Sequence, residues 1–140
     1  MSDSILSYNA ITGDALNKEL HSIPDERKAL IEGLVYEKSI LQVSADPGVG
    51  KSTIVACAIA QAASGLPVFS VLHISKPLKC YYIPFERGRE EIYERLLHME
   101  SVMPLDYSNI FINDNFIGAN VLDIRDADKI IRTIKADCPY

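Results

Sequence analysis

The sequence lacks several features that would assign it to other protein classes. It has no apolar run near the roughly 18 residues that span a membrane, and its first ten residues, MSDSILSYNA, do not form a secretion signal. It also has no basic excess, because 14 Lys and Arg stand against 19 Asp and Glu, a formal charge of −5. These absences predict a soluble, cytoplasmic protein without a membrane partner, and the charge argues weakly against a nucleic-acid surface.

Cysteine and histidine are few and widely spaced. The cysteines are odd in number and form no C-x-x-C pair, which favours free thiols in a reducing compartment: Cys57, Cys80 and Cys138. The histidines have no metal-ligand spacing: His21, His73 and His98. The sequence therefore predicts no metal site other than one for Mg²⁺.

The length of 140 residues suits one α/β domain. We expect a lead-in segment over residues 1–32 and the N-terminal part of an ATPase domain over residues 33–140. Apolar periodicity and breaker residues predict helices over 14–20, 25–33, 51–64, 90–100 and 126–136. Short apolar runs predict strands over 39–44, 80–85 and 109–114.

This alternation of strands and helices predicts a mainly parallel sheet with right-handed crossovers and helices on both faces. In such sheets the ligand binds beyond the carboxyl ends of the strands. Residues that follow the three predicted strands, namely Ala45, Glu86 and Asn115, should therefore gather at one edge of the sheet.

The segment after the first predicted strand has the pattern of a phosphate-binding P-loop. Residues 45–52, ADPGVGKS, fit G-x-x-x-x-G-K-[ST] except that Ala45 replaces the first glycine. The segment comprises Ala45, Asp46, Pro47, Gly48, Val49, Gly50, Lys51 and Ser52, followed by Thr53. The glycines let backbone N–H groups point inward, and the helix that begins near Lys51 adds its positive end.

Three side chains at the end of this segment have predicted partners. Lys51 should reach the β- and γ-phosphates, the Ser52 hydroxyl should hold Mg²⁺, and Thr53 is a further hydroxyl near the α-phosphate. The alternative is a chance glycine-rich turn before a helix. Its position between a predicted strand and a predicted helix favours the P-loop, and Ala45 is a mild departure from the pattern.

A carboxylate closes the second predicted strand. Glu86 can orient and deprotonate an attacking water, but it can equally be a favourable acid at a helix N-terminus, and the residues alone leave the two open. Arg87 and Arg89 share this ambiguity, since arginine at an exposed helix start is usually a solvated charge.

Three blocks together resemble the RecA-like ATPases: SILQVSADPGVGKST, CYYIPFERGREEIYERL and NIFINDN. The chain is most similar to the DnaB-like and plasmid RepA-like hexameric helicases, with an AAA-type ATPase domain, and to their KaiC-like and RadA-like relatives. The resemblance runs from about Leu30 to the end. It implies a three-layer RecA-like P-loop fold, ring or filament assembly, and a catalytic role for Glu86.

The resemblance also implies parts that this sequence does not contain. The next element in that family is a strand ending in the Walker B aspartate, and the sequence ends at KADCPY, so we expect a chain truncated before Walker B and a fold incomplete at its C-terminus. Asp114 is the only positional candidate for that role, although the resemblance places it on an additional strand. Arginine-finger and DNA-contacting residues would lie beyond residue 140.

These observations favour an ATP- and Mg²⁺-dependent ATPase that couples hydrolysis to work on DNA, as a helicase or a helicase-like replication or recombination motor. Two alternatives stay open. One is a small-molecule P-loop kinase, and the other is an ATP-binding switch module without turnover. Single-stranded DNA is a possible partner through regions beyond residue 140.

Overall fold

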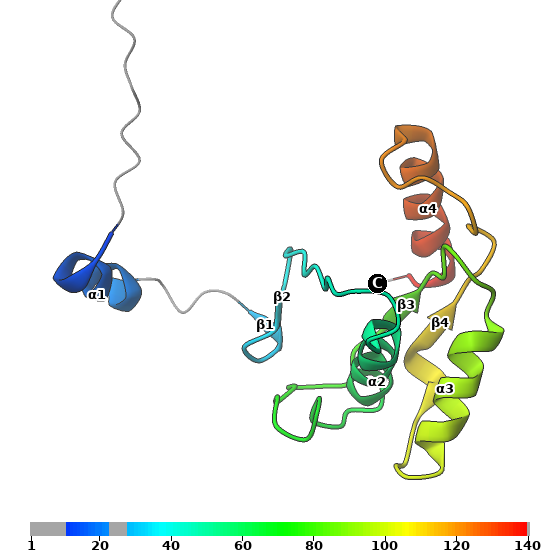
Figure 1. Cartoon of the computed structure of the whole chain (residues 1–140), viewed down its shortest axis with the longest axis horizontal. Coiled ribbons are helices and arrows are strands. Elements are labelled where there is room, and N and C mark those ends of the chain that lie inside the picture. The colour runs from blue at the N-terminus through cyan, green and yellow to red at the C-terminus, as the bar shows by residue number, and fades with distance from the viewer. Residues whose placement is uncertain (1–10, 23–27, 140) are drawn as a thin grey trace, which may run out of the picture.

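The structure is a computed structural model that describes residues 11–22 and 28–139. Figure 1 shows short strands between longer helices. In chain order the elements are α1 (Gly13–Ser22), β1 (Ala29–Ile31), β2 (Val35–Tyr36), α2 (Lys51–Ala63), β3 (Cys80–Tyr82), α3 (Glu90–Glu100), the 3₁₀ turn η1 (Tyr107–Asn109), β4 (Ile110–Ile112) and α4 (Ile124–Asp137).

The central body is a parallel strand pair covered by two helices. β3 and β4 pair in register from Cys80 opposite Ile110 to Tyr82 opposite Ile112. α2 contributes Ala56 and Ala60, which are fully buried against α3, and small side chains at these positions let the two helices approach closely. The apolar positions of α3 complete this core: Ile92, Leu96 and Met99.

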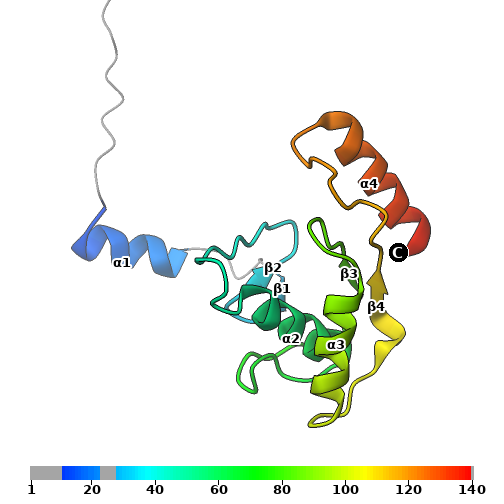
Figure 2. The same ribbon diagram turned by 45° about the vertical axis from the view of Figure 1, so that its right-hand side comes forward.

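The C-terminal end of α4 reaches the opposite face of the strand pair. Successive side chains of a strand point to opposite faces, so Tyr81 and Phe111 lie away from α2 and stack on each other with ring centroids 6.1 Å apart. The hydroxyl of Tyr81 donates to the Asp137 carboxylate at the end of α4. The two views in Figures 1 and 2 show α4 beside the ends of β3 and β4 and apart from α2 and α3.

A second cluster packs against the C-terminal end of α2. It joins the β1–β2 hairpin to the loop that follows α2 and contains Ile31, Ala62, Val68 and Ile74. The amide of Glu32 donates to the carbonyl of His73 at 3.0 Å, which ties the hairpin to this loop. By contrast, α1 buries none of its residues.

Most of the predicted elements are confirmed. The helices predicted over 14–20, 51–64, 90–100 and 126–136 correspond to α1, α2, α3 and α4. The strands predicted over 80–85 and 109–114 correspond to β3 and β4, which are shorter but parallel as expected.

The helix predicted over 25–33 is wrong where the structure describes it. Residues 25–27 lie outside the described part, and residues 29–36 form the antiparallel hairpin β1–β2. Gly33 adopts φ 72° in the turn between these strands, so the glycine expected to end a helix instead reverses the chain. Packing of Ile31 against Val68 and Ile74 outweighs the helical signal of the charged residues.

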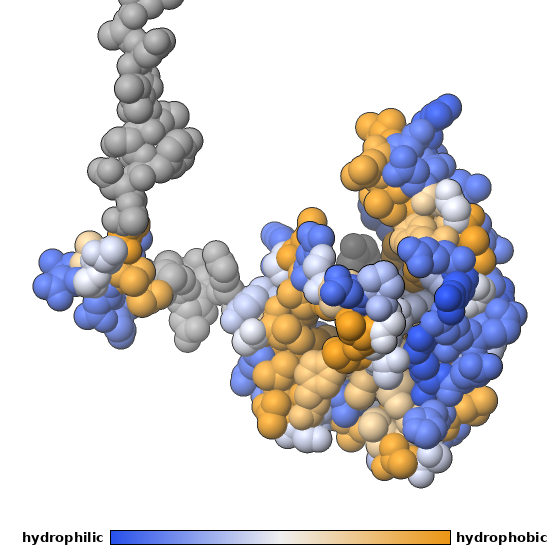
Figure 3. Space-filling model, in the orientation of Figure 1, coloured by the Kyte–Doolittle hydropathy of each residue, from blue (hydrophilic) through white to orange (hydrophobic). Residues whose placement is uncertain are grey.

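The strand predicted over 39–44 is also wrong. The segment has no regular structure, and Ile40 is 98% exposed. A strand needs a neighbour for its backbone N–H and C=O groups, and within the described residues the two sheets are β1–β2 and β3–β4, neither of which includes this segment. Ile40, Leu41 and Val43 therefore add exposed apolar area. Figure 3 shows hydrophobic colours over the side that carries the β1–β2 hairpin and hydrophilic colours over the α3 side.

The single sheet with three layers that we expected is seen only in part. The described residues contain one parallel pair with α2 and α3 on one face and the C-terminal end of α4 at the other, and the antiparallel hairpin forms a separate sheet. The complete RecA-like arrangement stays a prediction.

Candidate functional site

The P-loop pattern folds into a tight turn that leads directly into α2. Gly48 and Gly50 have φ values of 82° and 94°, in the region that side chains with a Cβ rarely adopt. Gly50 is the N-cap of α2, and no side chain caps the helix there. The helix therefore starts with its free amides open to a ligand.

The backbone amides of this turn are uncommitted. The first hydrogen bond of α2 runs from the amide of Ile54 to the carbonyl of Gly50, at 3.0 Å. Within the described part of the chain, none of the amides of residues 48–53 donates a hydrogen bond. Unpaired amides and the positive end of a helix form a site that attracts an anion such as phosphate.

The side chains of the P-loop add one cation and two hydroxyls. The Lys51 ammonium folds back over the turn and donates to the carbonyls of Ala45 and Asp46, the latter at 3.2 Å. Ser52 and Thr53 are exposed at the start of α2. The Thr53 hydroxyl accepts a hydrogen bond from Nε of Arg95 at 3.2 Å.

A cavity of about 730 Å³ lies between the P-loop and the loop that connects β3 to α3. This volume is within the range of small-molecule sites. We call residues 83–89 the acid loop, because they carry Glu86. The cavity is lined by P-loop residues, by acid-loop residues including Glu86, and by α3: among them Gly50, Lys51, Ser52, Glu86, Ile92 and Arg95.

Glu86 is exposed on the wall that faces the P-loop. Within the described residues its carboxylate makes no hydrogen bond or ion pair, so it is available to a bound molecule. P-loop residues within 47–53 line the same cavity as Glu86, whereas Ala45, which was expected beside Glu86, does not line it. Asn115, expected at the same edge, does not line the cavity, and its amide donates to Oδ1 of Asn113 at 3.0 Å.

Asp114 lies outside the cavity and has another partner. Its carboxylate accepts two hydrogen bonds from the guanidinium of Arg89, and this guanidinium lowers the pKa of Asp114. Arg87, in contrast, lines the cavity and lies 3.8 Å from Glu91. From the sequence, Arg87 and Arg89 had the same two possible roles, whereas in the structure Arg87 lines the cavity and Arg89 pairs with Asp114 outside it.

Arg95 is a cavity residue that sequence reasoning missed. It donates to the Glu91 carboxylate one helical turn earlier, which lowers the pKa of Glu91, and to the hydroxyl of Thr53. Its side chain is 21% exposed. The sequence contained a signal for this residue: Glu91 and Arg95 are four positions apart, so they can pair on a helix, and they lie beside Ile92, which α3 buries.

A comparison with protein families assigns the chain to a family. A family model described as an AAA domain matches residues 12–140. The chain belongs to the AAA domain family. Searches of curated proteins and of solved structures found no match.

Membership of the AAA domain family makes this chain a P-loop nucleotide-binding ATPase domain, and such domains bind ATP, usually with Mg²⁺. The segment 45–53 lies within the matched residues, as do the acid loop and α3. In the described residues, no helix of this AAA domain is long and apolar enough to cross a membrane.

Proposed function

We propose that this AAA domain binds ATP through its P-loop and hydrolyses it with Glu86 as the base, as the motor domain of a RecA-like DNA-processing ATPase. The observation that carries the proposal is the juxtaposition in one cavity of uncommitted P-loop amides and an unpaired carboxylate. The first group suits a polyphosphate, and the second suits the water that attacks it.

Each residue of the P-loop has a role in this proposal. The amides of residues 48–53 receive the phosphate oxygens, and Lys51 leaves the carbonyls of Ala45 and Asp46 to meet the β- and γ-phosphates. This exchange suits an ammonium that already lies over the loop. Asp46, Pro47 and Val49 supply the backbone of the turn.

The donor set near Ser52 suits Mg²⁺. This cation prefers hard oxygen ligands in octahedral geometry, and Ser52 offers an exposed hydroxyl beside the phosphate position. Bound there, the cation would neutralise charge on the β- and γ-phosphates. The cavity also offers Glu86 and Glu91, but Glu91 already pairs with Arg95, so Ser52 is the ligand we assign.

The chemical step requires a water and a base. A water oxygen attacks the γ-phosphorus, the bond to the β-phosphate oxygen breaks, and ADP leaves. Glu86 takes the proton of that water, a role that contributes about 10²–10⁴-fold in comparable enzymes. Thr53 and Arg95 lie on the same cavity wall and complete the polar surface around the nucleotide.

The work on DNA and the assembly into a ring or filament rest on the sequence blocks that resemble hexameric helicases. In that arrangement a neighbouring subunit donates an arginine finger. The test is the release of inorganic phosphate from ATP by the intact protein, with and without single-stranded DNA. We expect turnover that DNA stimulates and that Glu86→Gln lowers about 10²–10⁴-fold.

Two results would contradict this proposal in different ways. Phosphate that appears on a metabolite, with no free phosphate released, would indicate a kinase. Tight ATP binding without turnover in the intact protein, unchanged by Glu86→Gln, would indicate a switch module.

A further inference from the structure

The acid loop is fastened on both sides of Glu86 by the segment that follows β4. We call residues 113–118 the post-β4 segment. On the N-terminal side of Glu86, the amide of Gly118 donates to the carbonyl of Phe85 at 2.9 Å. On the C-terminal side, the guanidinium of Arg89 donates from Nε to Oδ2 of Asp114 at 3.0 Å and from Nη2 to Oδ1.

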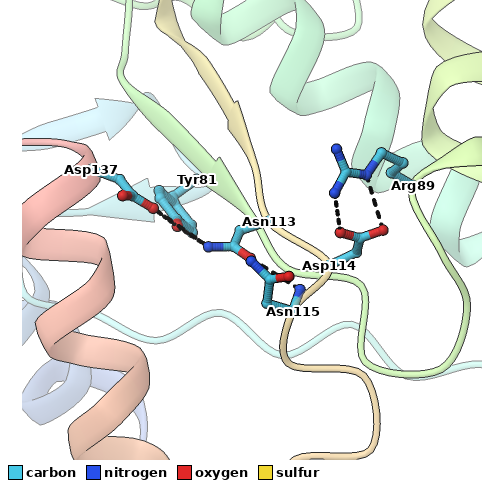
Figure 4. Close-up of polar contacts among 6 residues, drawn as sticks. All are labelled: Tyr81, Arg89, Asn113, Asp114, Asn115 and Asp137. Carbon is cyan, nitrogen blue, oxygen red and sulfur yellow. Dashed lines mark hydrogen bonds and ion pairs between the residues drawn. The ribbon is translucent and has the colours of Figure 1, made fainter.

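The Arg89–Asp114 pair has bidentate geometry, as Figure 4 shows. Two parallel hydrogen bonds fix the orientation of a guanidinium as well as its distance from the carboxylate. Gly88 lies near the pair, because a Cβ added there would be in van der Waals contact with Oδ2 of Asp114 at 3.9 Å and closer still to the Glu90 carboxylate. Only Glu86, Arg87 and Gly88 lie between the two attachment points.

The backbone beside Asp114 is held in place by hydrogen bonds of Asn113. The neighbouring Asn113 amide nitrogen donates to the Tyr81 hydroxyl at 2.9 Å, and the Asn113 backbone amide donates to the carbonyl of Tyr82 at 3.1 Å. Tyr81 is in turn bound to Asp137 of α4 (Figure 4). The end of β4 therefore connects the acid loop to α4 on the other face of the strand pair.

Neither member of the pair lines the cavity. A group outside the cavity can influence chemistry inside it by fixing a residue that lies there. The pair joins the acid loop to the post-β4 segment, and Asp114 is only 18% exposed. Its bidentate geometry therefore fixes the orientation of the loop in addition to any contribution to stability.

We propose that Arg89 and Asp114 are positioning residues for Glu86: their bidentate pair, together with the Gly118 to Phe85 hydrogen bond, holds the acid loop so that the Glu86 carboxylate faces the P-loop. This inference rests on the proposed function, in which Glu86 is the base. A displacement of about 1 Å in a catalytic group can cost about 10²-fold in rate, so a loosened loop should slow turnover without removing the phosphate site.

The first arm of the test needs no nucleotide. Amide hydrogen exchange is followed in the full chain for the wild type, Arg89→Ala, Asp114→Ala and the control Arg132→Ala. Arg132 forms an exposed ion pair with Asp128 on α4, outside the site. We expect exchange at the Gly118 amide to rise roughly two- to fivefold in the two loop variants and to stay unchanged in the control.

The second arm is a double-mutant cycle on ATP turnover. Arg89→Ala should lower kcat by roughly tenfold or more and leave KM within about twofold. In the Glu86→Gln background the same substitution should have no further effect on turnover, because Arg89 acts through Glu86. Asp114→Ala should reproduce Arg89→Ala, and the double variant should be no worse than either.

The two arms separate failure of this inference from failure of the proposed function. Unchanged Gly118 exchange in Arg89→Ala would overturn the inference whatever the nucleotide does. Equal slowing by Arg89→Ala with and without Glu86 would overturn it as well. Absence of ATP binding by the wild type would overturn the proposed function, and the exchange arm would still decide whether the pair holds the acid loop.

Discussion

The two walls of the cavity are built in opposite ways. On the P-loop wall, the amides of residues 48–53 make no hydrogen bond within the described part of the chain, and Lys51 is held only by carbonyls of its own loop. On the opposite wall, the acid loop is bound to the post-β4 segment by Gly118 and Asp114. One wall leaves its polar groups open to a ligand, and the other fixes its backbone and leaves one carboxylate unpaired.

This difference teaches how the site divides binding from chemistry. Uncommitted amides contribute to affinity because a phosphate satisfies them, whereas a base contributes to rate only if its position is fixed before the substrate arrives. We therefore expect substitutions on the P-loop wall to change affinity and substitutions on the acid-loop wall to change turnover.

The largest expected effect is on the acid-loop wall. Glu86→Gln keeps the shape of the side chain but removes the base, so turnover should fall about 10²–10⁴-fold while ATP affinity changes little. Phosphate release and calorimetric binding, measured on the same preparation, check both halves of this prediction. A loss of affinity that matches the loss of turnover would show that binding and catalysis are not separated between the two walls.

The next effect concerns the P-loop wall. Lys51→Ala removes the cation that meets the phosphates, and a hydrogen bond between charged groups contributes about 1.5–3 kcal/mol, so affinity for ATP should fall roughly 10- to 150-fold. Lys129→Ala, an exposed lysine of α4, is the control. In the wild type, ATP at about 100 times its Kd should stabilise the fold by roughly 2.7 kcal/mol, which a thermal melt detects. An equal melting shift in Lys51→Ala would contradict the assignment of the P-loop.

These predictions depend on residues that the sequence already revealed, and the reason is local. The P-loop, the strand before Glu86 and the helix after it are specified by short-range signals: glycines at fixed spacing, an apolar run and an amphipathic period. The structure places them in one cavity as expected. α2, α3 and α4 were found for the same reason.

The features that sequence reasoning missed depend on contacts between distant segments. The hairpin β1–β2 replaces a predicted helix because Ile31 packs against Val68 and Ile74. Residues 39–44 look like a strand by composition but have no partner strand among the described residues. The Arg89–Asp114 pair joins residues 25 positions apart, which no local pattern specifies.

One glycine substitution in the P-loop wall and one in the post-β4 segment that holds the acid loop sharpen the comparison further. Gly50 and Gly118 both have positive φ, at 94° and 80°, where alanine is strained by about 1–2 kcal/mol. Gly50 belongs to a turn whose amides make no hydrogen bond within the described residues, so the turn can change conformation to relieve the strain of Gly50→Ala. The amides would then no longer point at the phosphates, and ATP affinity should fall. Gly118 donates to Phe85, so Gly118→Ala should instead lower the free energy of unfolding. Melts and ATP titrations of both variants distinguish these outcomes, and identical behaviour of the two would remove the distinction between the walls.

The smallest expected effect lies outside both walls. Ile40→Ser changes a side chain that is 98% exposed, and substitutions at such positions usually stay within about 0.5 kcal/mol. The melting temperature and the ATP affinity should both be unchanged. A clear loss of stability would mean that residues 39–44 are covered in solution.

The measurement that tests the central claim most directly is an NMR titration of the full chain with Mg²⁺ and a non-hydrolysable ATP analogue. We predict that the amides of residues 48–53 shift and gain protection from exchange, whereas those of α4 do not change. P-loop amides that stay unchanged at saturating analogue, or shifts confined to another part of the chain, would contradict the assignment of this cavity as the ATP site.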